Sequence, residues 1–188
     1  MTISGLPGDL EAAIARLVDA RVEARLGALG VGDTNRVSLL VFSGEMDRLF
    51  AAFTVALASA ASGMEVSMYF TFWGLAALRK RKVYAGKTLG EKLVSMMLPS
   101  GPAAVGTSRM HWGGIGPRFF KHLMKRRNVE SLPGMIAVAR EMGIKMIACE
   151  MSMNIMGLTR EELVDGLTYG GAATYVADAA GAKITLFV

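Results

Sequence analysis

The sequence predicts an α/β protein in which a parallel sheet carries helices on both faces. Short apolar runs of strand length, such as 37–42 and 144–149, alternate with segments of helical periodicity. A chain of 188 residues has room for one domain with a substantial core. Strands that alternate with helices favour parallel pairing, because each helix returns the chain to the same edge of the sheet.

The first predicted element is an amphipathic helix over residues 9–29. Its apolar residues recur at intervals of three and four, with charged residues between them. These apolar residues are Leu10, Ile14, Leu17, Val18, Val22, Leu26 and Leu29. Gly30 and Gly32 then loosen the chain. We therefore divide the sequence into an appended helix and linker over 1–32 and an α/β domain over 33–188.

The domain opens with two predicted strand and helix pairs. The run 37–42 is apolar and reads as a central strand, and the helical pattern 46–61 follows it. The run 65–72 predicts a second strand, and a short helix is expected over 75–80. The order between residues 82 and 129 is predicted only in part.

Helical patterns and breakers place the remaining elements. Within 82–129 we expect helices over 89–98 and 117–127, the second with Pro117 in its first turn. A helix over 132–142 is capped by Ser131 and ended by Gly143, and a strand then runs up to Cys149. A helical pattern over 150–157 is followed by a helix over 159–166, which Thr159 and Glu162 open as a capping box. The last elements are a helix over 171–180 and a strand over 183–188.

The high hydropathy of the chain requires a test for membrane spans. Hydrophobic residues make up 52% and the mean hydropathy is +0.38. The most apolar stretch, 49–78, is divided by Gly63 and Glu65 into pieces shorter than the roughly 20 residues of a spanning helix. We interpret it as buried core. The amino terminus does not resemble a secretory signal, and the single cysteine excludes an internal disulfide, so we expect a cytoplasmic protein.

Basic residues exceed acidic ones and gather in two clusters. Lys and Arg number 21 against 16 Asp and Glu, which gives a net charge of +5. The clusters are 79–82 (Arg-Lys-Arg-Lys) and the group Arg118, Lys121, Lys125, Arg126 and Arg127. Such clusters attract anionic partners, although most charge clusters are simply solvated surface. We expect no nucleic-acid partner.

Cys149 is the first candidate for chemistry. It ends a buried strand, where open α/β sheets place their ligands, and a helix follows it. Backbone N–H groups at the start of a helix favour a thiolate over a thiol. The alternative is that Cys149 is a small apolar core residue. A zinc site is not expected, because His111 and His122 lack the usual ligand spacing to Cys149.

The residues around Cys149 resemble the DsrE family of sulfur-relay proteins, in its branch with the Cys-x-Met-Ser-Met signature. The resemblance covers residues 37–188. It depends on 143–158 (Gly-Ile-Lys-Met-Ile-Ala-Cys-Glu-Met-Ser-Met-Asn-Ile-Met-Gly-Leu), 114–120 (Gly-Ile-Gly-Pro-Arg-Phe-Phe), 130–133 (Glu-Ser-Leu-Pro) and 161–163 (Glu-Glu-Leu). It implies a DsrE-like three-layer fold with a mostly parallel sheet of about five strands, and assembly into homo-oligomers.

The resemblance also implies that Cys149 carries sulfane sulfur as a persulfide. The leading hypothesis is a sulfur carrier or sulfurtransferase that exchanges sulfur with a rhodanese-like or TusA-like protein. Met151, Ser152 and Met153 are the candidate substrate-binding residues, with backbone N–H donors, and Arg118 is a candidate that only folding could bring close. No metal or cofactor is expected. The methionines near the cysteine either fill the core or form a soft wall around the sulfur.

Two alternatives remain open. A one-cysteine redox enzyme of the peroxidase kind would oxidise Cys149 to a sulfenic acid and depend on an external thiol, because the chain has no second cysteine. A non-enzymatic peripheral membrane or scaffold protein is the third hypothesis, suggested by the hydropathy and by the basic cluster at 79–82, and is not favoured.

Overall fold

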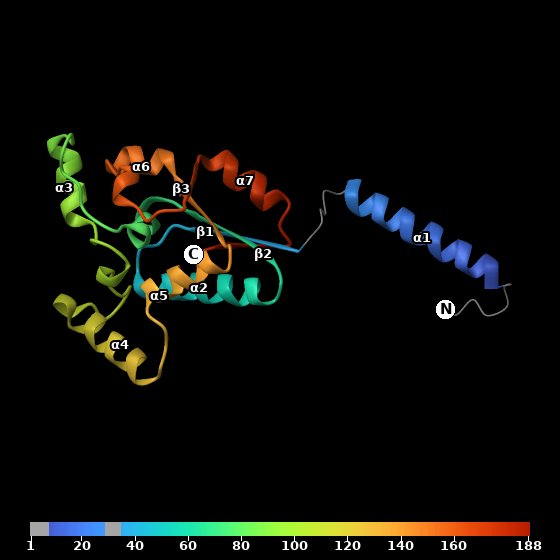
Figure 1. The fold of residues 1–188 in the computed structure, drawn as a ribbon, viewed down its shortest axis with the longest axis horizontal. Coiled ribbons are helices and arrows are strands. Elements are labelled where there is room, and N and C mark those ends of the chain that lie inside the picture. The colour runs from blue at the N-terminus through green and yellow to red at the C-terminus, as the bar shows by residue number, and fades with distance from the viewer. Residues whose placement is uncertain (1–7, 29–34) are drawn as a thin grey trace.

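A computed structural model of the chain describes residues 8–28 and 35–188, and its centre is a five-stranded parallel sheet. The strands lie in the order β4, β3, β2, β1, β5 (Figure 1). Their bounds are Arg36–Val41 for β1, Glu65–Phe70 for β2, Lys145–Cys149 for β3, Thr168–Gly170 for β4 and Ile184–Phe187 for β5. The predicted α/β class and parallel sheet are confirmed.

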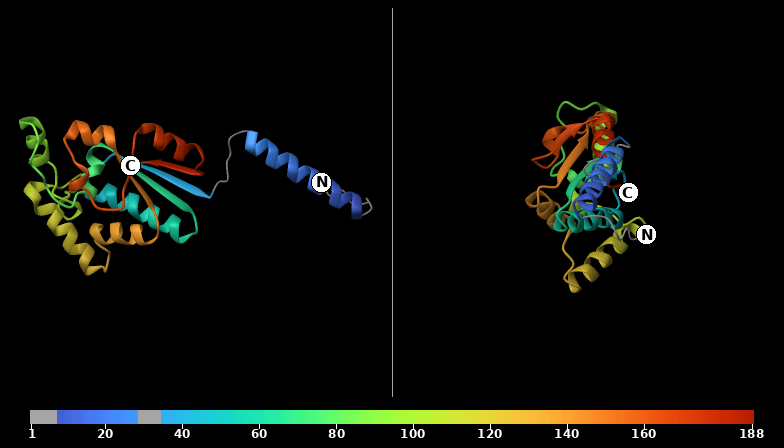
Figure 2. Two further views of the ribbon diagram at one scale, coloured as in Figure 1. Left: turned by 45° about the horizontal axis from the view of Figure 1, so that its top comes forward. Right: turned by 90° about the vertical axis from the view of Figure 1, so that its right-hand side faces the viewer.

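Helices cover both faces of this sheet, as Figures 1 and 2 show. α2 (Met46–Ala61) and α5 (Leu132–Glu141) lie on one face, and α6 (Glu150–Met156) and α7 (Ala172–Ala180) lie on the other. α3 (Leu89–Met97) and α4 (Ile115–Arg126) lie beyond the carboxyl ends of the strands. Short 3-10 turns complete the fold: η1 (Phe72–Leu78), η2 (Pro102–Ala104), η3 (Trp112–Gly114) and η4 (Arg160–Glu162).

The main hydrophobic core lies between the sheet and the α2 and α5 layer, and it continues through η1 to Met153 and Met156 of α6. Alternate residues of the strands point into it, because successive side chains of a strand face opposite sides. Its members include Leu39, Phe53, Met68 and Ile136, all buried. The stretch 49–78 supplies α2, β2 and η1 of this core, as predicted. Within the described residues, no helix is both long and apolar enough to cross a membrane.

A buried ionic cluster joins the segment around α3 to Glu162 of η4, which is distant in the sequence. Arg79 donates to Glu162 at 2.7 Å, and Lys87 donates to the other oxygen of the same carboxylate. The Arg79 and Glu162 side chains are fully buried and that of Lys87 nearly so. Ser95 of α3 adds a hydroxyl that Arg79 contacts at 3.0 Å. We call Arg79, Lys87, Ser95 and Glu162 the Glu162 cluster.

The Glu162 cluster corrects two predictions. Arg79 belongs to a predicted surface cluster of basic residues but is buried, because Glu162 supplies its counter-charge. The helix predicted over 159–166 is only the turn η4. Thr159 and Glu162 do form the predicted capping box. The chain then extends, because Leu163 pairs with Arg79 and Val164 donates to Leu78.

Other element predictions differ in smaller ways. The strand β4 has only three residues and was not predicted, since Thr168–Gly170 carries no apolar alternation. The predicted short helix at 75–80 is the 3-10 turn η1, which begins three residues earlier. α4 begins at Ile115, two residues before the predicted start. Gly157 ends α6 in a left-handed conformation, and a Cβ there would lie 2.6 Å from the Glu91 side chain of α3.

α1 (Gly8–Ala28) confirms the predicted amino-terminal helix, which lies apart from the sheet in Figure 1. Leu17, Val18 and Val22 are each half or more exposed. The amphipathic description holds only in part: Arg21 and Arg25 follow Val18 and Val22 at helical spacing, so charges interrupt the apolar face. The predicted linker glycines Gly30 and Gly32 lie outside the described residues.

Candidate functional site: a buried cysteine among hydroxyl groups

Cys149 is the last residue of β3 and immediately precedes α6. Its partner across the ladder is Gly170 of β4. On the other side of β3, Ile147 pairs with Tyr69 of β2. Ile147, Cys149 and Tyr69 point to the same face and form a small apolar cluster, against which Leu40 and Tyr175 pack. The candidate site therefore lies on the α6 and α7 side of the sheet, away from the main core.

Three buried hydroxyl groups surround the sulfur of Cys149. Ser152 Oγ donates to Cys149 Sγ at 3.3 Å. Thr71 Oγ1 lies 2.8 Å from Ser152 Oγ. Since the one proton of Ser152 is directed to the sulfur, Thr71 donates to Ser152. Tyr69 supplies the third hydroxyl. We call Tyr69, Thr71 and Ser152 the hydroxyl cluster.

The hydroxyl cluster favours the thiolate form of Cys149. Burial alone raises the pKa of the thiol, because a charged sulfur loses water. The hydroxyl of Ser152 opposes burial most strongly, followed by the hydroxyl of Tyr69 and the backbone N–H of Ser152. Thr71 adds a smaller contribution, and together these groups lower the pKa of Cys149 below its ordinary value.

Cys149 lies at the carboxyl end of β3, where open α/β sheets place their ligands, but its side chain is buried there. The residue is only 2% exposed. The surroundings are nevertheless polar rather than purely hydrocarbon, because Ser152 directs both a hydroxyl and an amide hydrogen towards the sulfur. The site has the donors that a thiolate needs and lacks an open path to it.

Of the four candidate substrate-binding residues, Ser152 is the one that donates a side-chain hydrogen bond to the sulfur. Met151 is about half exposed and points to solvent, whereas Met153 is buried in the main core. Arg118 is exposed on α4, which lies across the sheet from α6 (Figure 1). The structure therefore does not place Arg118 beside Cys149, and its role as a candidate substrate-binding residue stays a prediction.

Sequence reasoning missed Tyr69 and Thr71. Tyr69 lies near the end of β2 and Thr71 directly follows that strand, about eighty residues before Cys149, and only the strand register brings them to it. A usable signal exists in the sequence: a tyrosine and a threonine close the strand that neighbours the cysteine strand. Within the part of the chain that the structure describes, no group of three His, Cys, Asp or Glu side chains is placed to hold a metal ion.

The protein is an α/β protein with a parallel sheet in the order β4, β3, β2, β1, β5. Its candidate site is a thiol at the carboxyl end of the interior strand β3. The chain belongs to the DsrE/DsrF/DrsH-like family, whose sequence profile matches residues 33–187. The resemblance inferred from the residues around Cys149 is thereby confirmed.

Individual relatives agree with this assignment. The chain is 40% identical over 156 residues to the uncharacterised protein YrkE of Bacillus subtilis strain 168, a match that covers 82% of this chain and 98% of that protein. It is 28% identical over 160 residues to the sulfur carrier protein DsrE2 of Allochromatium vinosum, covering 83% and 99%. The crystal structure of the ychN protein from E. coli shares the fold, with a TM-score of 0.51, 12% identity and coverage of 81% and 98%.

Proposed function

We propose that the protein is a sulfur carrier that holds sulfane sulfur as a persulfide on Cys149 and passes it to an acceptor thiol. The observation that carries this proposal is the set of donors around the sulfur, with Ser152 Oγ at 3.3 Å from Cys149 Sγ. Family membership and the similarity to a protein named as a sulfur carrier support a role in sulfur relay.

The transfer is a displacement at sulfur. The Cys149 thiolate attacks the outer sulfur of a donor persulfide, so that an S–S bond forms at Cys149 while the S–S bond of the donor breaks. The donor leaves as a thiolate and takes up a proton. The moving sulfur keeps its oxidation state, so the step needs no oxidant or reductant. Attack by an acceptor thiolate on the outer sulfur of Cys149 returns the protein to its starting state.

A buried thiol requires local opening before a partner can reach it. The element over the site that is least firmly packed is α7, in which no residue is fully buried. Its Tyr175 packs on Tyr69 with the ring centroids 5.6 Å apart. Elements with few buried contacts open at low free energy. We therefore assign access to Cys149 to movement of α7 and the Tyr175 side chain.

The proposed partners are protein thiols. A donor of the rhodanese-like or TusA-like kind and an acceptor thiol both suit a chain whose only cysteine is Cys149. A reducing compartment such as the cytoplasm keeps that thiol free, and the proposed protein acts there. Exposed apolar residues on α3 offer a surface for the homo-oligomer that the family resemblance implies: Leu89, Leu93, Met96 and Met97.

Sulfur loading tests the proposal against the peroxidase alternative. Purified protein is treated separately with inorganic polysulfide and with hydrogen peroxide, and the intact mass is measured. We expect rapid addition of one sulfur atom, reversed by a reductant and absent in Cys149→Ser. Fast addition of oxygen together with turnover of peroxide, without sulfur loading, would instead support the redox enzyme.

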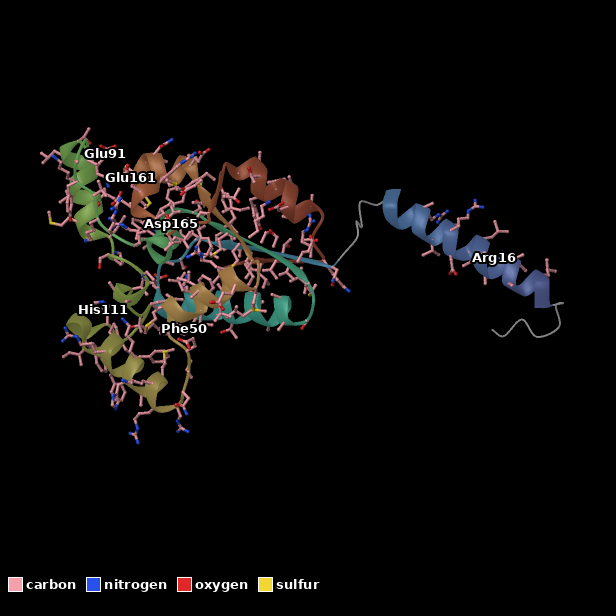
Figure 3. All side chains as sticks on the ribbon, in the orientation of Figure 1. Arg16, Phe50, Glu91, His111, Glu161 and Asp165 are labelled. Carbon is pink, nitrogen blue, oxygen red and sulfur yellow. The ribbon has the colours of Figure 1, made fainter. Side chains whose placement is uncertain are left out.

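A second candidate, binding to a membrane surface, is favoured by α4. The side chains of Trp112, Ile115 and Phe119 are each more than half exposed, and Phe120 and Leu123 extend the same apolar face. Arg118, Lys121 and Lys125 occupy another side of the helix. In Figure 3, His111 marks the start of this region, at the edge of the molecule. Such a distribution is typical of helices that lie in an anionic lipid interface.

Vesicle flotation tests this second candidate. The wild type is expected to float with vesicles of phosphatidylcholine and phosphatidylserine at low salt. The double variant Trp112→Ser and Phe119→Ser should stay at the bottom, because it loses the largest exposed side chains of the apolar face. Val176→Ser is the matched control, since Val176 is also exposed but lies on α7. Failure of the wild type to float removes this candidate.

A further inference from the structure

Tyr69 lies beside Cys149 on the neighbouring strand. Tyr69 pairs with Ile147 across the β2 and β3 ladder, and Cys149 follows Ile147 by two residues on the same face. Tyr69 is 3% exposed and shares one apolar cluster with Cys149. The ring of Tyr175 packs against the ring of Tyr69 at a tilt of 37°. The aromatic ring is therefore held in place next to the sulfur.

The hydroxyl of Tyr69 has no hydrogen-bond partner. In the described part of the chain, only three buried polar side-chain atoms share this condition, the others being Arg79 Nε and Thr107 Oγ1. A buried hydroxyl without a partner is unfavourable and calls for an explanation.

The sulfur of Cys149 is the polar atom on which this hydroxyl acts. Burial raises the pKa of Tyr69, and interaction with Cys149 raises it further. The tyrosine therefore keeps its proton and remains a donor at neutral pH. The hydroxyl of Tyr69 in turn helps to lower the pKa of Cys149. It faces the sulfur without completing a hydrogen bond of ordinary geometry.

A persulfide places a second sulfur in this neighbourhood. The added S–S bond is about 2.05 Å long, so the outer sulfur extends beyond Sγ. Ser152 already donates to Sγ itself. In the ionised persulfide the negative charge lies mainly on the outer sulfur, and a hydrogen bond to a charged acceptor is stronger than one to a neutral atom.

We propose that Tyr69 is a positioning residue of the sulfur carrier, whose hydroxyl donates a hydrogen bond to the outer sulfur of the Cys149 persulfide. This inference rests on the proposed function of Cys149. Ser152 holds the inner sulfur and Tyr69 holds the outer one. The pair stabilises the loaded state and directs the outer sulfur towards the side of the site that α7 covers.

The test is a sulfur-exchange equilibrium. Wild type, Tyr69→Phe and Tyr169→Phe are equilibrated with glutathione persulfide and glutathione, and the loaded fraction is measured by intact mass across a range of pH. Tyr69→Phe keeps the ring and removes only the hydroxyl. Its equilibrium constant for loading should fall about tenfold, because one charge-assisted hydrogen bond is lost. Tyr169→Phe is the matched control and should load as the wild type does, because Tyr169 pairs with Ala148 on the face of the sheet opposite Cys149.

The outcomes separate the two levels of the proposal. If the wild type takes up no sulfur on Cys149, the proposed function fails. If the wild type loads and Tyr69→Phe has the same equilibrium constant and pH profile, the role of Tyr69 is overturned while the carrier function stands. An equal loss in Tyr169→Phe also overturns it, because the effect would then not depend on the hydroxyl that lies beside the sulfur.

A measurement on the wild type does not depend on the folding of a variant. The NMR signal of the Tyr69 ring carbon that bears the hydroxyl is followed in protein with labelled tyrosine. We expect this signal to shift when sulfur is loaded and to return when the sulfur is removed by a reductant. An unchanged signal in fully loaded protein would contradict the proposed hydrogen bond.

Discussion

Ser152 lies between Thr71 and the sulfur of Cys149 in a chain of hydrogen bonds. It receives a hydrogen bond from Thr71 at 2.8 Å and gives one to Cys149 at 3.3 Å. Because the chain of donors ends on the sulfur, each proton in it is oriented in the direction that stabilises negative charge. The side chain is fully buried, so water does not replace it when it is removed.

Replacement of Ser152 by alanine should raise the pKa of Cys149. The lost hydroxyl is the strongest of the donors that oppose burial, and a hydrogen bond to a charged group contributes about 1.5–3 kcal/mol. The measurement is the rate of iodoacetamide alkylation against pH, which should show a midpoint at higher pH in Ser152→Ala than in the wild type.

Ser67→Ala is the control for this experiment. Ser67 is a buried serine that bonds to Ser38 at 3.2 Å rather than to the sulfur, so its loss should leave the alkylation midpoint unchanged. A midpoint in Ser152→Ala equal to that of the wild type would show that the hydroxyl does not stabilise the thiolate.

The sequence predicted which residue carries the candidate chemistry better than it predicted which side chains surround that residue. Cys149 and Ser152 were recognised because they belong to one short signature, whereas the sequence did not show that the Met151 side chain is exposed and that of Met153 is buried in the main core. Because residues two positions apart in a helix point to different sides, Met151 of α6 is exposed to solvent while Met153 is buried in the core. Tyr69 was missed because register between strands is a tertiary property.

At the scale of elements, the Glu162 cluster fixes the segment before α3 and the turn η4 against the sheet. Figure 3 labels two exposed acidic residues of the same segment, Glu161 directly before Glu162 and Asp165 three residues after it. Glu162 accepts bonds from Arg79, Lys87 and the backbone N–H groups of Val83 and Thr159. Burial raises the pKa of Glu162, but these donors outweigh it and lower the pKa.

Glu162→Gln should reduce the free energy of unfolding by about 3–5 kcal/mol, because two buried cations lose their counter-charge. Urea unfolding at neutral pH measures this loss. Glu161→Gln is the matched control: the Glu161 carboxylate pairs with Arg81 at 3.6 Å on the surface, and its loss should cost at most about 1 kcal/mol. Similar losses in the two variants would contradict the role of the buried cluster.

The same cluster predicts a pH dependence. The pKa of Glu162 is lower in the folded than in the unfolded chain, so its contribution is complete above the ordinary carboxyl pKa of 4.5 and is lost as pH falls through the folded value. The acid-induced loss of stability should therefore be smaller in Glu162→Gln than in the wild type.

Element predictions succeeded where the pattern is long and failed where structure depends on distant partners. α2, α5 and β1 have clear periodicity and lie close to their predicted bounds. The helix predicted at 159–166 has correct capping residues, but pairing of Leu163 with Arg79 ends it after one turn. β4 forms because its backbone pairs with β3. A segment of three residues has too short a pattern for this pairing to be predicted from the sequence.

At the scale of the whole molecule, the two faces of the sheet differ in what they bury and in how firmly they are covered. One face carries the main core under α2 and α5, and the other holds the sulfur under the lightly packed α7. The alternation of predicted strands and helices indicated this layered architecture. It did not predict that Cys149 is buried, because that burial depends on the helices that cover the residue. The central claim is that this covered thiol carries sulfur.

The most direct test of that claim is to locate the sulfur in loaded protein. After treatment with polysulfide and alkylation of the full chain, trypsin releases the peptide from Met146 to Arg160, which contains the single cysteine. Fragmentation should place one additional sulfur on Cys149, and a reductant applied before alkylation should remove it. Full alkylation of Cys149 without additional sulfur, over a range of donor concentrations, would contradict the account.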